Sequence, residues 1–419
     1  MKMALSLALL LTIAPLAGQE ATKELTSSRE IRGRYQVIFT HTIVAEPNGQ
    51  LELRDLRGDV VIAGTDGKQM VIIERIRTPI FSGGRSEQMA AEISGWLERI
   101  PDDTPVYTFR TDRNRRRDIS LSYSIKIPKV FNIYIRSFGG DIDLSELQGE
   151  LNLKTGGGDI SITSTIGRIM IKTSGGDIDV FKASGTLDLV TSGGDIEGRK
   201  LEGNISVKTG GGDIELIDSR GTLTSETGGG DIELRNFSGD KIRARTGGGD
   251  IELSKITATT NLMTGGGDVD VADLTGALEV ASGGGDISLR RTTGDMVLFT
   301  NHGDITANHV HGALRARSGS GDIIVTDWNI SATAKNSSLL ETRNGDIRLE
   351  LANNTAVEFT LTVLDTPPRY GMKQIYGNVD FTISREGGNT IGWYKPEKPL
   401  HTIQLETREG SISIMQPED

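Results

Sequence analysis

A short motif, glycine followed by aspartate, recurs through the middle of this chain at a nearly constant interval. Its aspartates are Asp141, Asp159, Asp177, Asp195, Asp213, Asp231, Asp250, Asp268, Asp286, Asp304 and Asp322. Successive aspartates lie 18 residues apart at every step except one of 19, between Asp231 and Asp250, and Asp346 follows after 24. Such regularity is typical of one supersecondary unit stacked on copies of itself. The sequence therefore predicts a repeat architecture in which each repeat contacts mainly its neighbours.

The repeat from Asp159 to Gly176 indicates what one unit contains. Ile160 and Ile162 alternate with polar neighbours, and the alternation resumes after a break at Gly167. Alternation with period two indicates two short strands per repeat. Because the same four positions are apolar in nearly every repeat, they should face one shared interior. We predict an all-β fold, a right-handed parallel β-solenoid with about 18 residues and two main strands per rung.

The corner before each aspartate is rich in glycine and is preceded by threonine. Runs such as Gly210–Gly212 suit a tight reversal of the chain, because only glycine adopts positive φ freely. The preceding threonines share the parity of the interior positions: Thr155, Thr173, Thr191, Thr209, Thr227, Thr246 and Thr264. We expect a ladder of hydrogen-bonded threonine hydroxyls just inside this corner.

The repeats occupy residues 139–350, and the flanking segments should cap the stack. Residues 19–138 are predicted to form an N-terminal β-rich cap with one helix near residues 86–100, for which Ser86 is the expected N-cap. Residues 351–419 should form a C-terminal β-rich cap. Each end is thereby expected to be closed by sequence that departs from the repeat.

The first 18 residues have the composition of a secretory signal peptide. Lys2 precedes the apolar stretch Ala4–Leu16, which is too short to span a bilayer comfortably, and Ala17 and Gly18 suit a cleavage site. No later segment is apolar enough to cross a membrane. The mature protein is therefore expected to be secreted, either to the periplasm or to the cell surface and beyond.

Composition argues against several functions. A net charge of −11 is unfavourable for a nucleic-acid partner. The lack of cysteine excludes disulfides, thiolate metal sites and cysteine nucleophiles. The sequence contains no nucleophile elbow, phosphate-binding loop or zinc-protease motif, and its glycine runs lead into strands instead of helices. We therefore expect that the protein is not an enzyme, has no catalytic residue and requires no cofactor.

The stacked aspartates pose an electrostatic problem. At about 4.8 Å between rungs they would repel by roughly 1–3.5 kcal/mol per neighbouring pair. In one solution each carboxylate accepts hydrogen bonds from glycine N–H groups of the corner. In the other a row of Ca²⁺ ions neutralises them, as in calcium-binding β-rolls. Those rolls repeat their motif about every nine residues, so the hydrogen-bonded corner is favoured here.

The two outward faces of the predicted stack differ in charge. Positions two beyond the repeat aspartates are acidic at Asp143, Asp179, Glu197, Glu215, Glu233, Glu252 and Asp270. The opposite strand carries Lys154, Lys172, Lys208, Arg243, Arg245, Arg315 and Arg317. Most such faces are simply solvated, but the mixed-to-basic one is a candidate for binding an acidic polymer.

One corner departs from the monotony of the repeat. Positions five beyond successive aspartates hold Arg291, His309 and Asp327, with His311 and Trp328 beside them. Stacking should bring an arginine, a His–Asp pair and an exposed tryptophan together, as in a sugar-binding or hydrolytic pocket. The alternative is a column of polar turn residues beside one packed tryptophan. These five are the candidate binding residues, and no metal ligand is assigned.

Three stretches carry a family resemblance: the repeat over residues 139–350, the unit Leu56–Gly67, and Ile125–Pro128 leading into Ser137–Ile142. They resemble the bacterial putative-adhesin family of unknown function. The resemblance implies surface adhesion and supplies no functional residues. We therefore expect a secreted, non-catalytic, adhesin-like scaffold that binds polysaccharide, a cell-envelope component or another cell. The alternatives are a polysaccharide-acting β-helix enzyme and a calcium-binding β-roll, and the sequence selects no oligomeric state.

Overall fold

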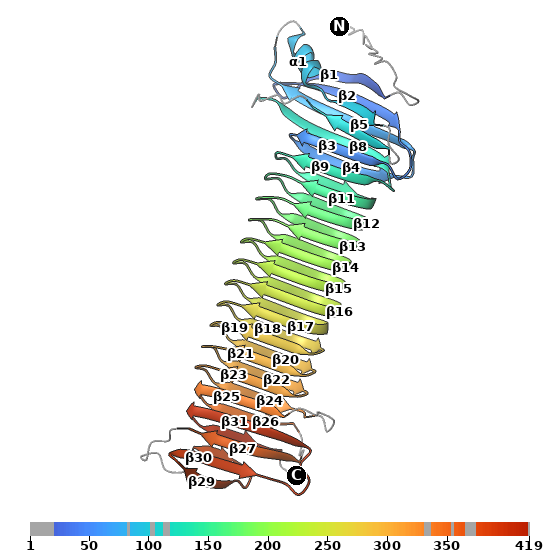
Figure 1. Cartoon of the computed structure of the whole chain (residues 1–419). Helices are drawn as coiled ribbons and strands as arrows, with labels where there is room; N and C mark the ends of the chain where they lie inside the picture. Colours follow the sequence, from blue (N-terminus) through green and yellow to red (C-terminus); the bar gives the residue numbers. More distant parts are fainter. Residues whose placement is uncertain are drawn as a thin grey trace. The chain divides into compact units, whose positions relative to one another are not determined.

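The computed structural model describes residues 21–81, 84–100, 105–111, 118–330, 337–352, 356–364 and 374–417. The chain forms two compact units, unit 1 within residues 1–209 and unit 2 within residues 210–419. Both are built from stacked β-strands, and one short helix is described in unit 1 (Figure 1). The predicted all-β, parallel solenoid is confirmed. The predicted signal peptide, residues 1–18, lies outside the described residues.

The elements follow one another along the chain in both units. Those of unit 1 are β1 (Thr22–Ile31), β2 (Arg34–Val44), β3 (Gln50–Leu56), β4 (Asp59–Thr65), β5 (Gln69–Thr78), α1 (Arg85–Ile93), β6 (Trp96–Ile100), β7 (Val106–Arg110), β8 (Ser120–Pro128), β9 (Asn132–Ser137), β10 (Ile142–Ser145), β11 (Gln148–Lys154), β12 (Ile160–Lys172), β13 (Ile178–Val190) and β14 (Ile196–Thr209). Those of unit 2 are β15 (Ile214–Thr227), β16 (Ile232–Thr246), β17 (Ile251–Thr264), β18 (Val269–Thr275), β19 (Leu278–Ser282), β20 (Ile287–Thr293), β21 (Met296–Thr300), β22 (Ile305–His311), β23 (Leu314–Ser318), β24 (Ile323–Trp328), β25 (Ser338–Asn344), β26 (Ile347–Leu351), β27 (Val357–Val363), β28 (Ile375–Gly377), β29 (Thr382–Glu386), β30 (Asn389–Tyr394), β31 (His401–Glu409) and β32 (Ile412–Met415).

The repeats of unit 1 lie on one another in parallel and in register. β12 pairs with β13 so that Ile160 lies beside Ile178 and Ile169 beside Leu187. All four side chains are fully buried, as predicted for the shared interior. Because the ladder of backbone hydrogen bonds continues through the bend of the rung, the two predicted strands join into one long strand.

The bend of a rung is made by two residues with positive φ. In β12 they are Ser164, with φ of 54°, and Gly167, with φ of 137°. A Cβ atom on Gly167 would lie 2.0 Å from the carbonyl oxygen of Gly149 on the preceding rung. Glycine is therefore required here both by the backbone conformation and by the close approach of the rungs.

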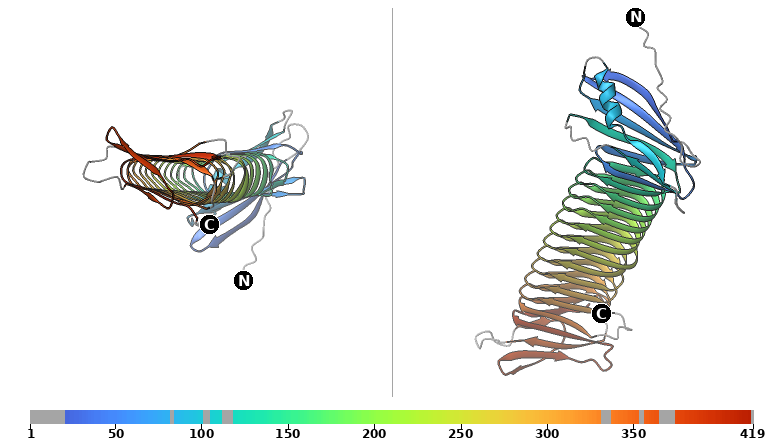
Figure 2. Two further views of the ribbon diagram at one scale, coloured as in Figure 1. Left: turned by 90° about the horizontal axis from the view of Figure 1, so that it is seen from below. Right: turned by 45° about the horizontal axis from the view of Figure 1, so that its top comes forward.

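Unit 2 repeats this arrangement, but from β18 onward the bend divides each rung into two separate strands. β18 pairs with β20 through Val269 and Ile287, and β19 pairs with β21 through Leu278 and Met296. These side chains are also buried. Figure 2 shows the strands of the stack winding around a common interior within each unit.

The predicted threonine ladder is present at the glycine-rich corner. In unit 1 the Thr173 hydroxyl donates to the carbonyl oxygen of Gly158 over 3.0 Å and accepts the N–H of Gly176 over 3.3 Å. Thr264 makes the equivalent bonds in unit 2, over 2.8 and 3.0 Å. Each hydroxyl thus links two successive corners, whose backbone groups would otherwise lack partners inside the stack.

The N-terminal end of unit 1 changes from parallel to antiparallel pairing. β3 and β4 form a rung beside β9 and β10, with Leu51 opposite Ile133 and Val60 opposite Ile142. β7 and β8 pair with the other edges of β3 and β4. β8 then pairs antiparallel with β5, β5 with β2 and β2 with β1 (Figure 1).

The helix at this end is shorter than predicted. α1 ends at Ile93, and the residues from Trp96 onward form β6, which pairs antiparallel with β7. The N-cap is Gly84, in the left-handed conformation, instead of Ser86, whose hydroxyl donates to the carbonyl oxygen of Pro79 over 3.2 Å. Met89, Ile93 and Trp96 stand at helical spacing in the sequence, but beyond Ile93 pairing with β7 outweighs local propensity, and Trp96 is 44% exposed.

At the C-terminal end of unit 2 the order of the strands in space departs from their order in sequence. β31 and β32, the last strands of the chain, pair with β25 and β26. β27 and β28 pair with the opposite edges of β31 and β32, and β30 and β29 extend the layer antiparallel. The final strands are thus inserted between strands that precede them in sequence.

Candidate functional site

The repeat aspartates form a hydrogen-bonded ladder in each unit. In unit 1 the Asp159 Oδ1 accepts the backbone N–H of Asp177 over 2.9 Å, and Asp177 accepts that of Asp195 over 2.8 Å. The equivalent bonds of unit 2 measure 2.7 or 2.8 Å. A hydrogen-bonded carboxylate was predicted, but its donor is the N–H of the next aspartate instead of a glycine. This charge-assisted bond offsets part of the repulsion between stacked carboxylates.

The ladder has a consequence for metal binding. One oxygen of each carboxylate is engaged by the neighbouring rung, so the side chain is held against the stack. Within the described residues no group of three or more histidine, aspartate or glutamate side chains is placed to hold a metal ion. The ladder carboxylates are thus engaged by backbone donors within the stack.

The predicted Arg291–His309–Asp327 corner is a column of residues in the left-handed conformation. In unit 2 their φ values lie between 51° and 56° at Asp218, Asn236, Lys255, Asp273, Arg291, His309 and Asp327. The corresponding residues of unit 1 have the same conformation. None of them is glycine, so each rung holds an ordinary side chain in a strained backbone at this bend.

Arg291 is engaged by the preceding rung. Its Nε lies 2.5 Å from Asp273 Oδ1 and its Nη2 lies 2.9 Å from Asp273 Oδ2, a bidentate pair. The hydrogen bonds from Arg291 hold the pKa of Asp273 below its ordinary value, and Asp273 raises the pKa of Arg291. Arg291 therefore links its own rung to the preceding one and does not form a pocket with His309.

His309 and Asp327 do meet, as the spacing predicted. The His309 Nε2 lies 2.7 Å from Asp327 Oδ2, and the Nδ1 contacts the Asn308 amide oxygen. The Asn308 amide nitrogen donates to the Thr326 hydroxyl over 2.6 Å. Both ring nitrogens of His309 are therefore engaged by neighbouring side chains of the same surface, Asp327 on one side and Asn308 on the other.

Trp328 is fully buried, so the prediction of an exposed tryptophan is wrong. Its indole Nε1 donates to the carbonyl oxygen of Gly312 over 3.0 Å. The physical reason is parity: the position six beyond each aspartate faces the interior, where Phe237 and Ile256 are buried on other rungs. His311 is half-buried, and within the described part of the chain its ring makes no hydrogen bond or ion pair. The structure therefore assembles no common pocket from the five predicted residues.

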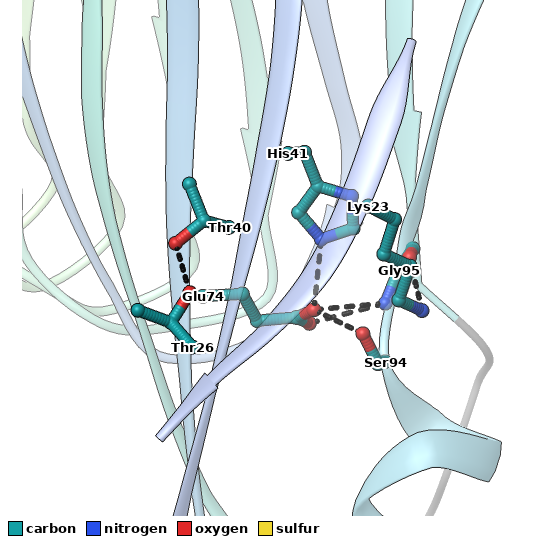
Figure 3. A network of polar contacts seen from close by, with 7 residues as sticks. All are labelled: Lys23, Thr26, Thr40, His41, Glu74, Ser94 and Gly95. Atoms are coloured by element: carbon teal, nitrogen blue, oxygen red, sulfur yellow. Dashed lines mark hydrogen bonds and ion pairs between the residues drawn. The ribbon is translucent and has the colours of Figure 1, made fainter. Parts of the chain in front are cut away.

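A second polar cluster lies in unit 1 and was missed by the sequence analysis (Figure 3). The carboxylate of Glu74 is fully buried, and it accepts the Ser94 hydroxyl over 2.6 Å and the Gly95 N–H over 3.1 Å. The Nε2 of buried His41 lies 3.5 Å from Glu74 Oε2. Lys23 donates to the Gly95 carbonyl oxygen over 3.1 Å, and burial lowers its pKa while Glu74 opposes that effect.

This cluster holds the turn between α1 and β6 against the β2–β5 sheet. Glu74 and His41 occupy inward positions of β5 and β2, among apolar neighbours. A charged residue at an inward position of an alternating strand was the available signal. Because the Glu74 carboxylate is buried and hydrogen-bonded to Ser94 and Gly95, we assign the cluster a structural role.

An open groove of about 810 Å³ lies on unit 1. Its lining includes Arg54, Tyr134, Arg136, Phe138 and Lys154. Arg54 forms an ion pair with Glu52 over 2.6 Å, and the Arg57 guanidinium lies 5.9 Å from the exposed ring of Phe138. Burial, and then the neighbouring Glu150, raises the pKa of the Tyr134 hydroxyl. The groove thus combines cations with aromatic side chains.

The cations of the groove belong to a longer row, which we call the basic column. Its members lie opposite one another on five adjacent strands, β7, β3, β9, β11 and β12, and are Arg110, Arg54, Arg136, Lys154 and Lys172. All five are exposed. At the outer end of the column, Trp96 on β6 lies opposite Arg110. Strand spacing gives the five cations a length of about 19 Å.

The family comparison agrees with the repeat architecture. The Toastrack DUF4097 family model matches residues 99–221 and, overlapping them, residues 203–296. The chain is similar to the Toastrack family. This match supports the predicted resemblance to a family of unknown function. No curated protein matches the chain.

Two solved structures were also found. A putative cell adhesion protein from Clostridium sporogenes ATCC 15579 has 9% identity and a TM-score of 0.16, with 90% of this chain and 99% of that chain covered. A putative adhesin from Bacteroides fragilis NCTC 9343 has 13% identity and a TM-score of 0.14, with 91% and 97% covered. At these TM-scores neither structure carries an argument about this chain.

Proposed function

We propose that the protein is a secreted, non-catalytic, adhesin-like scaffold of the cell surface or envelope that binds polysaccharide. One observation carries the proposal: the outward side chains of successive rungs fall into columns, in which neighbouring members are about 4.8 Å apart. Such columns offer long, open surfaces on which a polymer can make the same contact repeatedly. Solenoids commonly bind partners along extended surfaces of this kind.

The use of the polar side chains supports a scaffold over an enzyme. The ladder aspartates bond to the next rung, the corner threonines bond to glycine backbone, and His309 faces two acceptors. These groups hold the stack together. A polysaccharide-acting enzyme would need a carboxylate or histidine free to exchange a proton with its substrate.

The location assigned here rests on the signal-like sequence of residues 1–18. Within the described residues no helix has the length and apolar character needed to cross a membrane. A soluble secreted product should appear in the periplasmic or extracellular fraction after cleavage near Gly18. Mass spectrometry of the mature N-terminus tests this part of the proposal.

The function is tested by a binding screen with mature protein, residues 19–419. Purified polysaccharides and isolated cell-envelope fractions are immobilised, and bound protein is measured together with any release of new reducing ends. Binding without release of product is the expected result. Formation of product would show that the protein is an enzyme and not a scaffold. Failure to bind any polysaccharide or envelope fraction would refute the proposed function.

A further inference from the structure

We propose that the basic column of unit 1, with Trp96 at its end, is a binding site for an acidic polysaccharide that carries carboxylate or sulfate groups. The inference rests on the proposed function and specifies both its site and its class of ligand. It concerns Trp96, Arg110, Arg54, Arg136, Lys154 and Lys172, none of which belongs to the Arg291–His309 corner.

The charge of the column is the first argument. Like charges directly opposite on neighbouring strands destabilise a sheet. Arg136 lies opposite both Arg54 and Lys154, and Lys154 lies opposite Lys172. Arg54 is paired with Glu52, whereas Arg136, Lys154 and Lys172 have no ion-pair partner among the described residues. A bound polyanion would relieve this repulsion.

The chemistry of the neighbouring groups is the second argument. Tyr134 and Asn152 lie opposite each other two residues before Arg136 and Lys154, so they form a parallel column on the same face. Their hydroxyl and amide groups suit sugar hydroxyls. The indole of Trp96, 44% exposed, offers a flat surface on which a sugar ring can pack. Arginine adds bidentate hydrogen bonds to carboxylate or sulfate.

The geometry of the column favours a linear polymer. The cations are spaced by one rung each and lie along a straight row across five strands. Part of the row, from Arg54 to Lys154, lies in the groove, whose lining also includes Thr111 and Leu121. A chain with anionic groups at intervals and hydroxyls between them can contact the cation and hydroxyl columns together.

The test compares two charge-reversed variants of the mature chain. Arg136→Glu with Lys154→Glu alters the basic column, and Arg243→Glu with Arg245→Glu makes the same charge change on exposed residues of unit 2. Binding to polygalacturonate, alginate, hyaluronan and dextran sulfate is measured by biolayer interferometry, with neutral dextran as control. Thermal unfolding confirms that both variants fold.

The expected result is binding of at least one acidic glycan, weakened at least about tenfold by the basic-column variant and much less by the unit 2 variant. Trp96→Ala should weaken binding of the same glycan several-fold, while neutral dextran should bind weakly to every variant. An equal loss of glycan affinity in both charge variants would refute the proposed site, because it would show only a general attraction between the protein's cations and the polyanion. Binding of dextran as tightly as of acidic glycans would overturn the ligand class.

Two further outcomes separate this inference from the proposed function. If glycan binding persists in the basic-column variant and in Trp96→Ala, the site is refuted and the scaffold function stands. If none of these glycans binds but other polysaccharides or envelope fractions do, the inference is refuted and the scaffold function stands; if those also fail to bind, both are refuted. Binding of single-stranded DNA or anionic vesicles as tightly as of the best glycan would also overturn the assignment to polysaccharide.

Discussion

The outermost position of the second strand in a rung is occupied very differently in the two units. In unit 1 it holds consecutive cations at Arg136, Lys154 and Lys172, followed by Val190 and Lys208. In unit 2 the same position reads Glu226, Arg245, Met263, Ala281, Phe299, Arg317 and Glu341. The interior of both units is nevertheless built alike, with buried aliphatic residues, a threonine or serine at the corner and the aspartate ladder.

This difference separates two demands on the sequence. Interior and corner positions are restricted by packing and by hydrogen bonds between rungs, so they repeat. Outward positions contribute little to stability and are free to vary. Cations at three successive rungs, Arg136, Lys154 and Lys172, bring like charges together and therefore do not serve stability.

The largest expected effect tests whether both units share one scaffold. Gly167→Ala in unit 1 and Gly294→Ala in unit 2 each place a Cβ about 2 Å from a carbonyl oxygen of the preceding rung, at φ of 137°. Each should destabilise the protein by at least about 3 kcal/mol. Urea unfolding measures the loss, and Gly175→Ala and Gly266→Ala, which meet open space, serve as controls. A mild effect in one unit alone would show that the scaffolds differ.

The next prediction transfers the surface of unit 1 to unit 2. Met263→Lys, Ala281→Lys and Phe299→Lys would complete a row of five cations between Arg245 and Arg317. Affinity for the acidic glycan bound by unit 1 should rise by about tenfold when measured in the Arg136→Glu, Lys154→Glu background. Biolayer interferometry at two salt concentrations would show a gain that declines with salt. No gain would mean that the column alone is insufficient.

A smaller loss of stability, equal in the two units, is expected from changes at the threonine corners. Thr173→Val in unit 1 and Thr264→Val in unit 2 each remove the donor to one glycine carbonyl oxygen and the acceptor of one N–H. Each change should lower the free energy of unfolding by about 1–3 kcal/mol. Parallel urea titrations of both variants would reveal any inequality between the units.

The smallest effects should have opposite signs in the two units. Burial, and then Glu197, raises the pKa of Asp179, so its charge destabilises unit 1 as pH rises through that pKa. Asp179→Asn should therefore raise the melting temperature at neutral pH, with a gain of less than about 1 kcal/mol in the free energy of unfolding. In acid it should change neither quantity. Because Arg291 lowers the pKa of Asp273, Asp273→Asn should lower the melting temperature at neutral pH, with the difference vanishing as pH falls through that pKa. Calorimetry from pH 3 to 7 tests both signs.

The repeat made the fold predictable, because period and parity together determine which side chains face inward. Where the period held, the predictions about the interior and the threonine corner were confirmed. The same parity rule, applied one step further, would have placed Trp328 inside, beside Phe237 and Ile256 of other rungs. Its misplacement came from treating a tryptophan near a histidine as a surface feature.

The part of the site outside the repeat could not be predicted in this way. Arg136, Lys154 and Lys172 are 18 residues apart and follow from the period. Arg54 and Arg110 join them only through pairing of β3 with β7 and β9, strands that are distant in sequence. Trp96 joins them because β6 is a strand, which its helical spacing of apolar residues concealed.

The aspartate ladder also indicates how such a chain can acquire new parts. Asp59 Oδ1 accepts the N–H of Asp141, 82 residues later, and Asp346 accepts that of Ser411, 65 residues later. The same contact elsewhere joins residues only 18 apart. The exposed carboxylate therefore binds the N–H group at which the next rung begins, whatever length of sequence lies between them. Segments inserted between two rungs can change in size and in content while the rungs on either side keep their register.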